Sequence, residues 1–203
     1  MKQLFQPPTP CREPGREELR KRRGQPSSHN ASNRAFVDAA SVNRPDIQII
    51  VPETSVQVEW ARDIFREYAG SLAVDLCFQN FEHEVMNLPG EYAAPRGTLM
   101  LALVEGAIAG CCALRPLDTA DYPNAAEMKR LYVRKAFRRF GLGRLLAESI
   151  MDSARQLGYA SVLLDTLDDM ESARALYAEL GFIEVPPYYH NPIAGSHYLK
   201  ADL

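Results

Sequence analysis

The alternation of hydrophobic and polar residues changes character near residue 46 of the chain. Upstream of Asp46 the sequence is rich in Pro, Arg, Ser and Asn and shows no sustained hydrophobic period. Such segments bury too little apolar surface to offset the entropy lost on ordering, so we expect residues 1–45 to be a disordered extension. Downstream, apolar residues recur with the periods of strands and helices, which predicts one folded domain over residues 46–203.

The apolar runs of this domain predict a sheet interspersed with helices. Short apolar runs bounded by Gly, Pro or polar residues are typical of strands, and apolar residues three or four apart predict helices. The Glu105-Gly106 pair between two such runs predicts a hairpin. In chain order we expect a strand at 47–51, a helix capped by Thr54 or Ser55, a short helix at 78–88, strands at 99–104, 107–114 and 127–133, a helix from 141 to Gly158, a strand at 161–164, a helix at 171–180, and strands at 182–185 and 197–203.

Two of these elements predict which side chains share a face. In the strand at 127–133, strict alternation places Met128, Arg130 and Tyr132 on one face and Lys129, Leu131 and Val133 on the other. In the helix that follows Gly141, the 3.6-residue period predicts one apolar face, which comprises Leu142, Leu145, Leu146, Ser149, Ile150, Ser153 and Leu157.

The composition excludes several classes of protein. Of the 203 residues, 46% are hydrophobic and 24% are charged, which is ordinary for a globular chain. No apolar run approaches the roughly 18–20 residues of a membrane span, and the N-terminus lacks the apolar stretch of a secretory signal. We therefore expect a cytoplasmic protein that does not enter a membrane.

Charge is distributed unevenly along the chain. Of the 23 basic and 26 acidic residues, nine and four precede Asp46, including the run Arg20-Lys21-Arg22-Arg23, which leaves 14 and 22 in the domain. A basic segment can contact nucleic acid, but the acidic domain carries no recognition motif for it. We expect no nucleic-acid partner.

The cysteines are Cys11, Cys77, Cys111 and Cys112, a spacing that fits neither a disulfide framework nor a set of metal ligands. The adjacent pair would point to opposite faces of a strand. We expect free, buried thiols and no metal.

The segment from Leu131 to Leu146 joins a strand, a short Arg/Gly loop and a strongly amphipathic helix. The first amides of a helix have no internal partners and lie at the positive end of its dipole, so they favour an anion. Gly141 and Gly143 would let a ligand approach the backbone closely, or they only relieve crowding between helix and strand. The spacing matches neither a nucleoside-triphosphate loop nor a dinucleotide fingerprint, which leaves coenzyme A as the candidate ligand.

Two motifs resemble the GNAT superfamily of N-acetyltransferases. Residues 138–143, Arg-Arg-Phe-Gly-Leu-Gly, match its pyrophosphate motif Arg/Gln-x-x-Gly-x-Gly/Ala, and residues 173–182, Ala-Arg-Ala-Leu-Tyr-Ala-Glu-Leu-Gly-Phe, match its signature Ala-x-x-Leu-Tyr-x-x-x-Gly-Phe. The resemblance covers residues 46–203 and implies the GNAT fold, an α/β (α+β) domain whose mixed, mostly antiparallel sheet of six to seven strands is flanked by about four helices. At Met170 the chain departs from the family, which often has an Asn there as a contact to the coenzyme arm.

The resemblance also implies a reaction, in which an acetyl group moves from acetyl-coenzyme A directly to a primary amine. By resemblance, main-chain groups of Tyr132, Val133 and Arg134 align the pantetheine, and the Val133 amide polarises the thioester carbonyl. The backbone amides that would hold the pyrophosphate belong to Arg138, Arg139, Phe140, Gly141, Leu142, Gly143 and Arg144.

Tyr177 matches the family tyrosine that acts as general acid at the coenzyme sulfur. A phenol with an ordinary pKa near 10 can donate a proton at neutral pH. The alternative is a core aromatic that packs between Leu176 and Phe182.

Glu127 is the candidate general base, directly or through water, because it opens the strand that leads to the coenzyme loop. The alternative is an exposed glutamate at a strand end. His83, His190 and His197 are other candidate bases, and we expect each of them to be structural or exposed.

The acceptor is expected on the face opposite the coenzyme, between residues 76–81 and 186–192. The candidate contacts are Phe78, Tyr188 and Tyr189. The aromatics and prolines of the second segment suit a small, partly apolar amine or an amino acid, or they only brace a long connection.

Two other functions stay open beside a small-molecule acetyltransferase. One is an acyl-coenzyme A sensor without turnover, which Met170 favours and which Tyr177 and Glu127 oppose. The other is acetylation of a protein N-terminus or lysine, which the acidic domain would assist by attracting a basic substrate. A homodimer is also left open.

Overall fold

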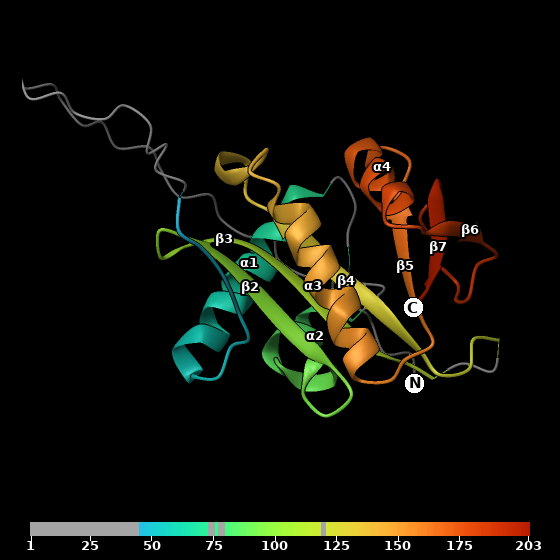
Figure 1. Ribbon diagram of the computed structural model, residues 1–203, viewed down its shortest axis with the longest axis horizontal. Coiled ribbons are helices and arrows are strands. Elements are labelled where there is room, and N and C mark those ends of the chain that lie inside the picture. The colour runs from blue at the N-terminus through green and yellow to red at the C-terminus, as the bar shows by residue number, and fades with distance from the viewer. Residues whose placement is uncertain (1–44, 73–75, 77–79, 119–120) are drawn as a thin grey trace, which may run out of the picture. The chain divides into compact units, whose positions relative to one another are not determined.

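The computed structural model describes residues 45–72, 76, 80–118 and 121–203. The predictions for residues 1–44, for Cys77 and for Phe78 lie outside these residues. The described chain forms a seven-stranded sheet with helices on both faces (Figure 1).

The elements follow the order expected from the sequence, and two short 3-10 helices are added to them in the described residues. The strands are β1 (Ile47–Ile50), β2 (Thr98–Val104), β3 (Ala107–Leu117), β4 (Ala125–Val133), β5 (Ser161–Leu167), β6 (Ile183–Val185) and β7 (Ser196–Asp202). The helices are α1 (Ser55–Ser71), α2 (Phe81–Met86), α3 (Leu142–Gln156) and α4 (Glu171–Glu179), with the 3-10 helices η2 (Gly90–Tyr92) and η3 (Lys135–Phe137). The predicted fold class is confirmed.

The sheet has the strand order β1-β2-β3-β4-β5-β7-β6. Every neighbouring pair is antiparallel except β4 and β5, which are parallel. Parallel neighbours need a crossover connection, which α3 supplies. The parallel pairing is short: only residues 125–127 of β4 pair with residues 161–163 of β5.

Each face of the sheet carries its own hydrophobic core. In Figure 1, α3 lies across one face, where Leu146 and Ile150 are fully buried, and α1 and α2 cover the other, where Ile64 and Phe65 are fully buried. Cys111 belongs to the core under α1 and α2, and its neighbour Cys112 to the core under α3. Both are free, buried thiols, as expected for adjacent residues of one strand.

Two helix predictions need correction. The helix predicted at 78–88 begins only at Phe81, because Asn80 before it adopts φ 56°, a left-handed conformation that no α-helical residue takes. On α3, the predicted apolar face is wrong for Leu145 and Leu157, which are 38% and 40% exposed. The buried surface of α3 instead follows rows four residues apart, comprising Leu142, Leu146, Ile150 and Ala154 together with Ala147 and Met151.

A β-bulge in β4 makes the predicted alternation wrong. Tyr132 lies opposite Cys111 of β3 and Lys129 lies opposite Ala113, so two residues of β4 face Cys112. Arg130 adopts φ 60° at this point. An extra residue shifts every later side chain to the other face. Met128 therefore packs under α3, whereas Arg130 and Tyr132 lie on the side of α1 and α2.

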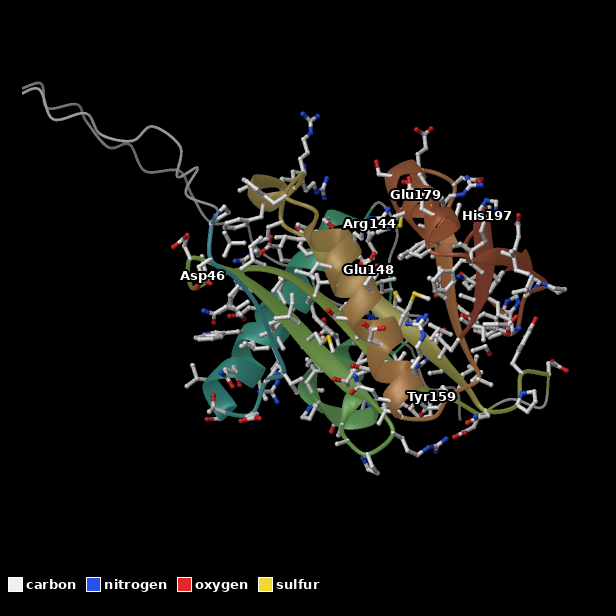
Figure 2. The ribbon with its side chains drawn as sticks, viewed as in Figure 1. Asp46, Arg144, Glu148, Tyr159, Glu179 and His197 are labelled. Atoms are coloured by element: carbon white, nitrogen blue, oxygen red, sulfur yellow. The ribbon has the colours of Figure 1, made fainter. Side chains whose placement is uncertain are left out.

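His197 on β7, labelled in Figure 2, connects the end of β5 to β6. Its Nε2 lies 2.5 Å from Oδ1 of Asp168, and its Nδ1 lies 2.8 Å from Oε1 of Glu184. These hydrogen bonds raise the pKa of His197 above its ordinary value of 6.5. A raised folded-state pKa gives stability that is complete below the unfolded-state pKa and is lost as pH rises through the folded-state pKa.

We therefore expect the free energy of unfolding to decline as pH rises from about 6.5 through the raised pKa of His197. Urea unfolding at several pH values measures this decline. His197→Gln should remove it, and the exposed His190→Gln is the matched control that should keep it. Equal pH dependence in the parent and in His197→Gln would contradict the assignment.

Candidate active site

The sheet opens between β4 and β5. The two strands stay paired through Glu127 and Leu163, and beyond these residues neither strand bonds to the other. The bulge at Arg130 follows directly on β4. Bulges bend a strand and increase its twist, which accounts for the separation of β4 from β5.

Two connected hollows occupy this opening. The outer groove, of about 590 Å³, runs from the start of α3 to α4 and is lined among others by Val133, Arg138, Gly143 and Leu176. The inner cavity, of about 70 Å³, lies deeper, and its lining includes Lys129, Asp165 and Tyr177. Both hollows share the lining residues Tyr68, Leu72, Leu131, Leu167, Met170 and Ala173, so they form one continuous cleft.

The start of α3 presents unpaired amides at the outer end of this cleft. Arg139 and Gly141 adopt φ 72° and 76°, and no side chain caps the helix. Within the described part of the chain, no hydrogen bond uses the backbone amides of residues 139–144. Together with the positive end of the helix dipole, these amides favour a bound anion.

Gly143 is not required by packing within the chain. A Cβ atom placed on it would meet only Cδ2 of Leu176, at 3.8 Å, an ordinary contact distance. Relief of crowding between helix and strand therefore does not explain glycine at this position, which leaves the predicted close approach of a ligand as the reason to be tested. Gly141 has a different reason for being glycine, because its φ of 76° disfavours any larger side chain.

The arginines of the loop have different partners. Arg138 donates from Nε to the carbonyl oxygen of Val133 at 3.1 Å, and Arg139 is exposed, as is Phe140. The side chain of Arg144 forms an ion pair with Glu179 of α4, and Figure 2 shows the two residues between the ends of these helices. This exposed pair links the first turn of α3 to the last residue of α4.

At the end of β4, main-chain groups face the outer groove, whereas the side chains of Tyr132 and Arg134 point toward α1. The amide of Arg134 donates to the carbonyl of Ala109 on β3 at 2.9 Å. Because alternate residues of an antiparallel strand bond to the same neighbour, the amide of Val133 points to the opposite edge, into the opening. The side chains of Tyr132 and Arg134 both bond to Glu67 of α1, at 3.1 and 2.8 Å.

Tyr177 combines a packed ring with an accessible hydroxyl. Its ring lies 5.6 Å from that of Phe182, so the alternative of a core aromatic is correct for the ring. Among the described residues the hydroxyl makes no hydrogen bond, and no fully buried polar side-chain atom is left without a partner. The hydroxyl therefore reaches the inner cavity. Burial raises the pKa of Tyr177 well above its ordinary value, which keeps the phenol protonated.

Glu127 is not an exposed strand-end residue, because it is only 1% exposed. Its Oε2 accepts a hydrogen bond from Nε of Arg115 at 2.8 Å, and its Oε1 accepts one from the hydroxyl of Tyr188 at 2.9 Å. Nζ of Lys129 lies 3.5 Å from Oε1. Glu127 lines a third hollow on the side of α2, which we call the side pocket.

The side pocket, of about 200 Å³, brings together several residues from the predicted acceptor region. It is lined by Glu84, Arg115, Leu117, Glu127, Lys129, Arg130, Tyr188, Tyr189 and His190. The rings of Tyr188 and Tyr189 lie 5.4 Å apart, and both pack edge-on against Tyr198. The predicted contact Phe78 lies outside the described residues.

Sequence reasoning missed two of the charged residues that line the inner cavity, Lys129 and Asp165. Nζ of Lys129 lies 3.1 Å from Oδ1 of Asp165. The available signal was an aspartate inside the apolar run 162–167. The strand predicted there ended at Leu164, three residues before the end of β5. A charged side chain in a buried strand usually has a partner.

Two further features of the described chain bear on its class. In the described ranges, no three His, Cys, Asp or Glu side chains gather closely enough to hold a metal ion. None of the helices there combines the length and the apolarity that a bilayer span requires.

Comparison with known proteins identifies the family. The profile of the acetyltransferase (GNAT) family matches residues 58–182. The chain is 40% identical over 141 residues to an uncharacterized N-acetyltransferase of Schizosaccharomyces pombe, across 69% of this chain and 85% of that protein.

Solved structures show the same fold. A GNAT-family acetyltransferase from Staphylococcus aureus superposes with a TM-score of 0.63 at 20% identity, covering 77% of this chain and 99% of that one. A putative acetyltransferase from Salmonella typhimurium, whose structure contains its cofactor acetyl-CoA, superposes with a TM-score of 0.56 at 16% identity, covering 77% and 94% of the two chains.

Proposed function

The chain belongs to the GNAT family of acetyltransferases, and from this premise we propose that it transfers the acetyl group of acetyl-CoA to a small primary amine. That it is an acyltransferase follows from the family; the donor and the acceptor are our proposal. One observation carries it: a single cleft has unpaired helix amides at its outer end and the hydroxyl of Tyr177 at its inner end. The presence of acetyl-CoA in the related Salmonella typhimurium structure supports the choice of donor.

In this proposal the donor's diphosphate binds the backbone amides between Arg138 and Arg144, close to Gly143. The pantetheine follows the outer groove along β4, where the outward amide of Val133 is available to its polar groups. Acetyl-CoA supplies the activated thioester, and the chain supplies orientation and proton transfers. Met170, which stands where the family often has Asn, offers only a thioether to the donor, and its Sδ already lies 3.7 Å from Oγ1 of Thr166.

Tyr177 is the proposed general acid. Its hydroxyl opens into the inner cavity, and burial keeps it protonated at neutral pH because its pKa is raised. A protonated phenol at this place can donate to the sulfur as the thiolate departs. The role of Glu127 as the general base stays a prediction. A comparison of Glu127→Gln with Asp165→Asn tests it.

The side pocket is the proposed entrance for the acceptor. Its volume of about 200 Å³ is below the roughly 300–1,000 Å³ of sites for drug-sized ligands, which favours a small molecule over a peptide. Lys129 lines both the side pocket and the inner cavity, so an amine that enters one hollow is adjacent to the other.

A thiol-release assay tests the proposal. The purified chain is mixed with acetyl-CoA and with pools of amino acids, polyamines, aminoglycosides and aralkylamines, and free coenzyme A is followed with a thiol reagent. We expect release with at least one pool. Binding of acetyl-CoA without release would favour a sensor or a protein acceptor, and absence of binding would overturn the proposal.

Gly143→Leu is the variant that ties binding to the cleft. A Cβ at this position meets Leu176 only at an ordinary contact distance, and a leucine there would obstruct the outer groove that Gly143 lines, so we expect the Kd for acetyl-CoA to rise at least about tenfold, or about 1.4 kcal/mol. Glu148→Leu, on the exposed side of the same helix, is the matched control and should bind as the parent does.

A further inference from the structure

A buried polar network joins the side pocket to the inner cavity. The hydroxyl of Tyr188 donates to Glu127, and Nζ of Lys129 lies 3.5 Å from Glu127 and 3.1 Å from Asp165. Asp165 also shares a hydrogen bond with the hydroxyl of Tyr189. Lys129 therefore sits between two carboxylates that face different hollows.

Only one of these carboxylates shares a hollow with the proposed acid. Asp165 and Tyr177 both line the inner cavity, whereas Glu127 lines the side pocket and not the inner cavity. A general base must lie within hydrogen-bond reach of the proton that it removes, directly or through one water. An amine that attacks a thioester beside Tyr177 is therefore nearer to Asp165.

The hydrogen-bond partners of the two carboxylates also distinguish Asp165 from Glu127. Both oxygens of Glu127 are engaged: Arg115 bonds to Oε2 through Nε and a terminal nitrogen, and Tyr188 and Lys129 approach Oε1. Protonation of Glu127 would weaken ion pairs with two cations, Arg115 and Lys129, whereas the ion pair of Asp165 is with Lys129. In the described part of the chain, Asp165 accepts hydrogen bonds from Lys129 and Tyr189, and it also lines the inner cavity.

We propose that Asp165 binds the ammonium group of the acceptor and removes its proton, and that Lys129 is the residue that positions Asp165. This inference rests on the proposed function and names a catalytic group for it. The acceptor class is a primary amine that is charged in solution and small enough to reach the inner cavity from the side pocket.

Each proton that moves in the proposed reaction has a donor and an acceptor. The ammonium loses one proton to the carboxylate of Asp165, and the resulting amine nitrogen forms a bond to the thioester carbon. The carbon–sulfur bond then breaks, and the thiolate takes the phenolic proton of Tyr177. The new amide nitrogen loses its second proton, which restores the phenol through solvent, and the proton on Asp165 leaves to solvent.

The charge of Asp165 suits a cationic ligand. Burial alone would raise the pKa of this carboxyl, but the charge and hydrogen bond of Lys129 lower it, so the group is ionised at neutral pH. The groups that face it come from five parts of the fold: Tyr68 on α1, Lys129 and Arg130 on β4, Tyr177 on α4, Tyr188 and Tyr189 before β7, and Tyr198 on β7.

The test compares Asp165→Asn with Glu127→Gln, each assayed with ethylamine, which is an ammonium at neutral pH, and with trifluoroethylamine, which is neutral there. Asp165→Asn should lower kcat/KM for ethylamine by about 10²–10⁴-fold, with a much smaller loss for trifluoroethylamine, because the latter needs no proton removed before attack. Glu127→Gln should lower both values by a similar factor. Circular dichroism and the Kd for acetyl-CoA establish that each variant folds and binds the donor.

Each outcome decides between the claims. A parent chain that is inactive with both amines and with every pool of the thiol-release assay would sink the proposed function and this inference with it. An active parent in which Asp165→Asn loses both substrates equally, or neither, would overturn the inference alone. A loss confined to ethylamine in Glu127→Gln would give the role to Glu127.

Lys129→Met tests the positioning role. Without the ammonium, the largest influence that lowers the pKa of Asp165 is lost while burial still raises it, so the acid limb of kcat/KM for ethylamine should move to higher pH by about one to three units. Lys129→Arg should restore the parent profile in part, because it keeps the charge. An unmoved acid limb in Lys129→Met would show that Lys129 is only structural.

Discussion

Replacing Tyr177 by Phe is expected to lower kcat by about 10²–10⁴-fold, the usual contribution of a general acid, while the Kd for acetyl-CoA stays the same. The ring that packs on Phe182 is kept, and only the hydroxyl that opens into the inner cavity is lost. The thiolate then leaves without a proton donor. Steady-state thiol release gives kcat, and calorimetry gives the Kd.

The matched control is Tyr159→Phe, which also removes one hydroxyl. Tyr159 lies at the other end of α3 in Figure 2, where its hydroxyl donates to the carbonyl of Arg96 at 2.6 Å. This variant should keep the parent kcat. An undiminished kcat in Tyr177→Phe would leave that residue with a packing role only.

Replacing Arg130 by Met is expected to destabilise the fold by about 3–5 kcal/mol, the cost of removing one partner from a buried ion pair. Arg130 is 3% exposed at its side chain and donates from Nε to Glu84 of α2 at 2.9 Å and from a terminal nitrogen at 2.5 Å. Its guanidinium also lies 5.2 Å from the ring centre of Phe81. The variant would leave Glu84 charged and short of this partner at the edge of the core. Urea unfolding measures the loss.

The pH dependence of the free energy of unfolding gives a second measure of the Arg130–Glu84 ion pair. Burial would raise the pKa of Glu84, but the hydrogen bond and charge of Arg130 lower it below its ordinary value of 4.5. A lowered folded-state pKa contributes stability that is present above the unfolded-state pKa and lost as pH falls through the folded-state pKa. The parent should therefore lose more stability below about pH 4.5 than the double variant Arg130→Met, Glu84→Gln. A loss in Arg130→Met under about 1 kcal/mol, the value of a surface pair, would contradict this account.

The sequence was sufficient for those parts of the fold that local chemistry determines. Glu105 and Gly106 adopt φ 49° and 75° in the turn of the β2–β3 hairpin, as a tight turn requires. Thr54 caps α1 with a full capping box, in which it exchanges hydrogen bonds with Gln57. The Arg/Gly loop before α3 has the strand–loop–helix setting that its pattern predicted.

The parts that the sequence did not predict depend on contacts between distant segments. Lys129 and Asp165 are 36 positions apart and meet because β4 and β5 are parallel neighbours. Glu127 has the residue type of a strand-end base, but its burial by Arg115 and Tyr188 comes from β3 and from the loop before β7. Arg130 in the bulge has no local signature, because Arg is an ordinary strand residue and its partner Glu84 comes from α2, far away in the sequence.

The bulge in β4 also makes the cleft depend on the number of residues in the strand. Residues 125–129 and residues 131–133 obey opposite odd–even rules, and one surplus position separates them. A substitution at Arg130 changes a side chain but preserves that count. Deletion of the single codon would instead remove the surplus position, so that β4 alternates without a bulge while Leu131, Tyr132 and Val133 keep their present faces. Insertions and deletions, rather than point changes, are thus the mutations that can convert this sheet between a split form that admits a ligand and a closed one.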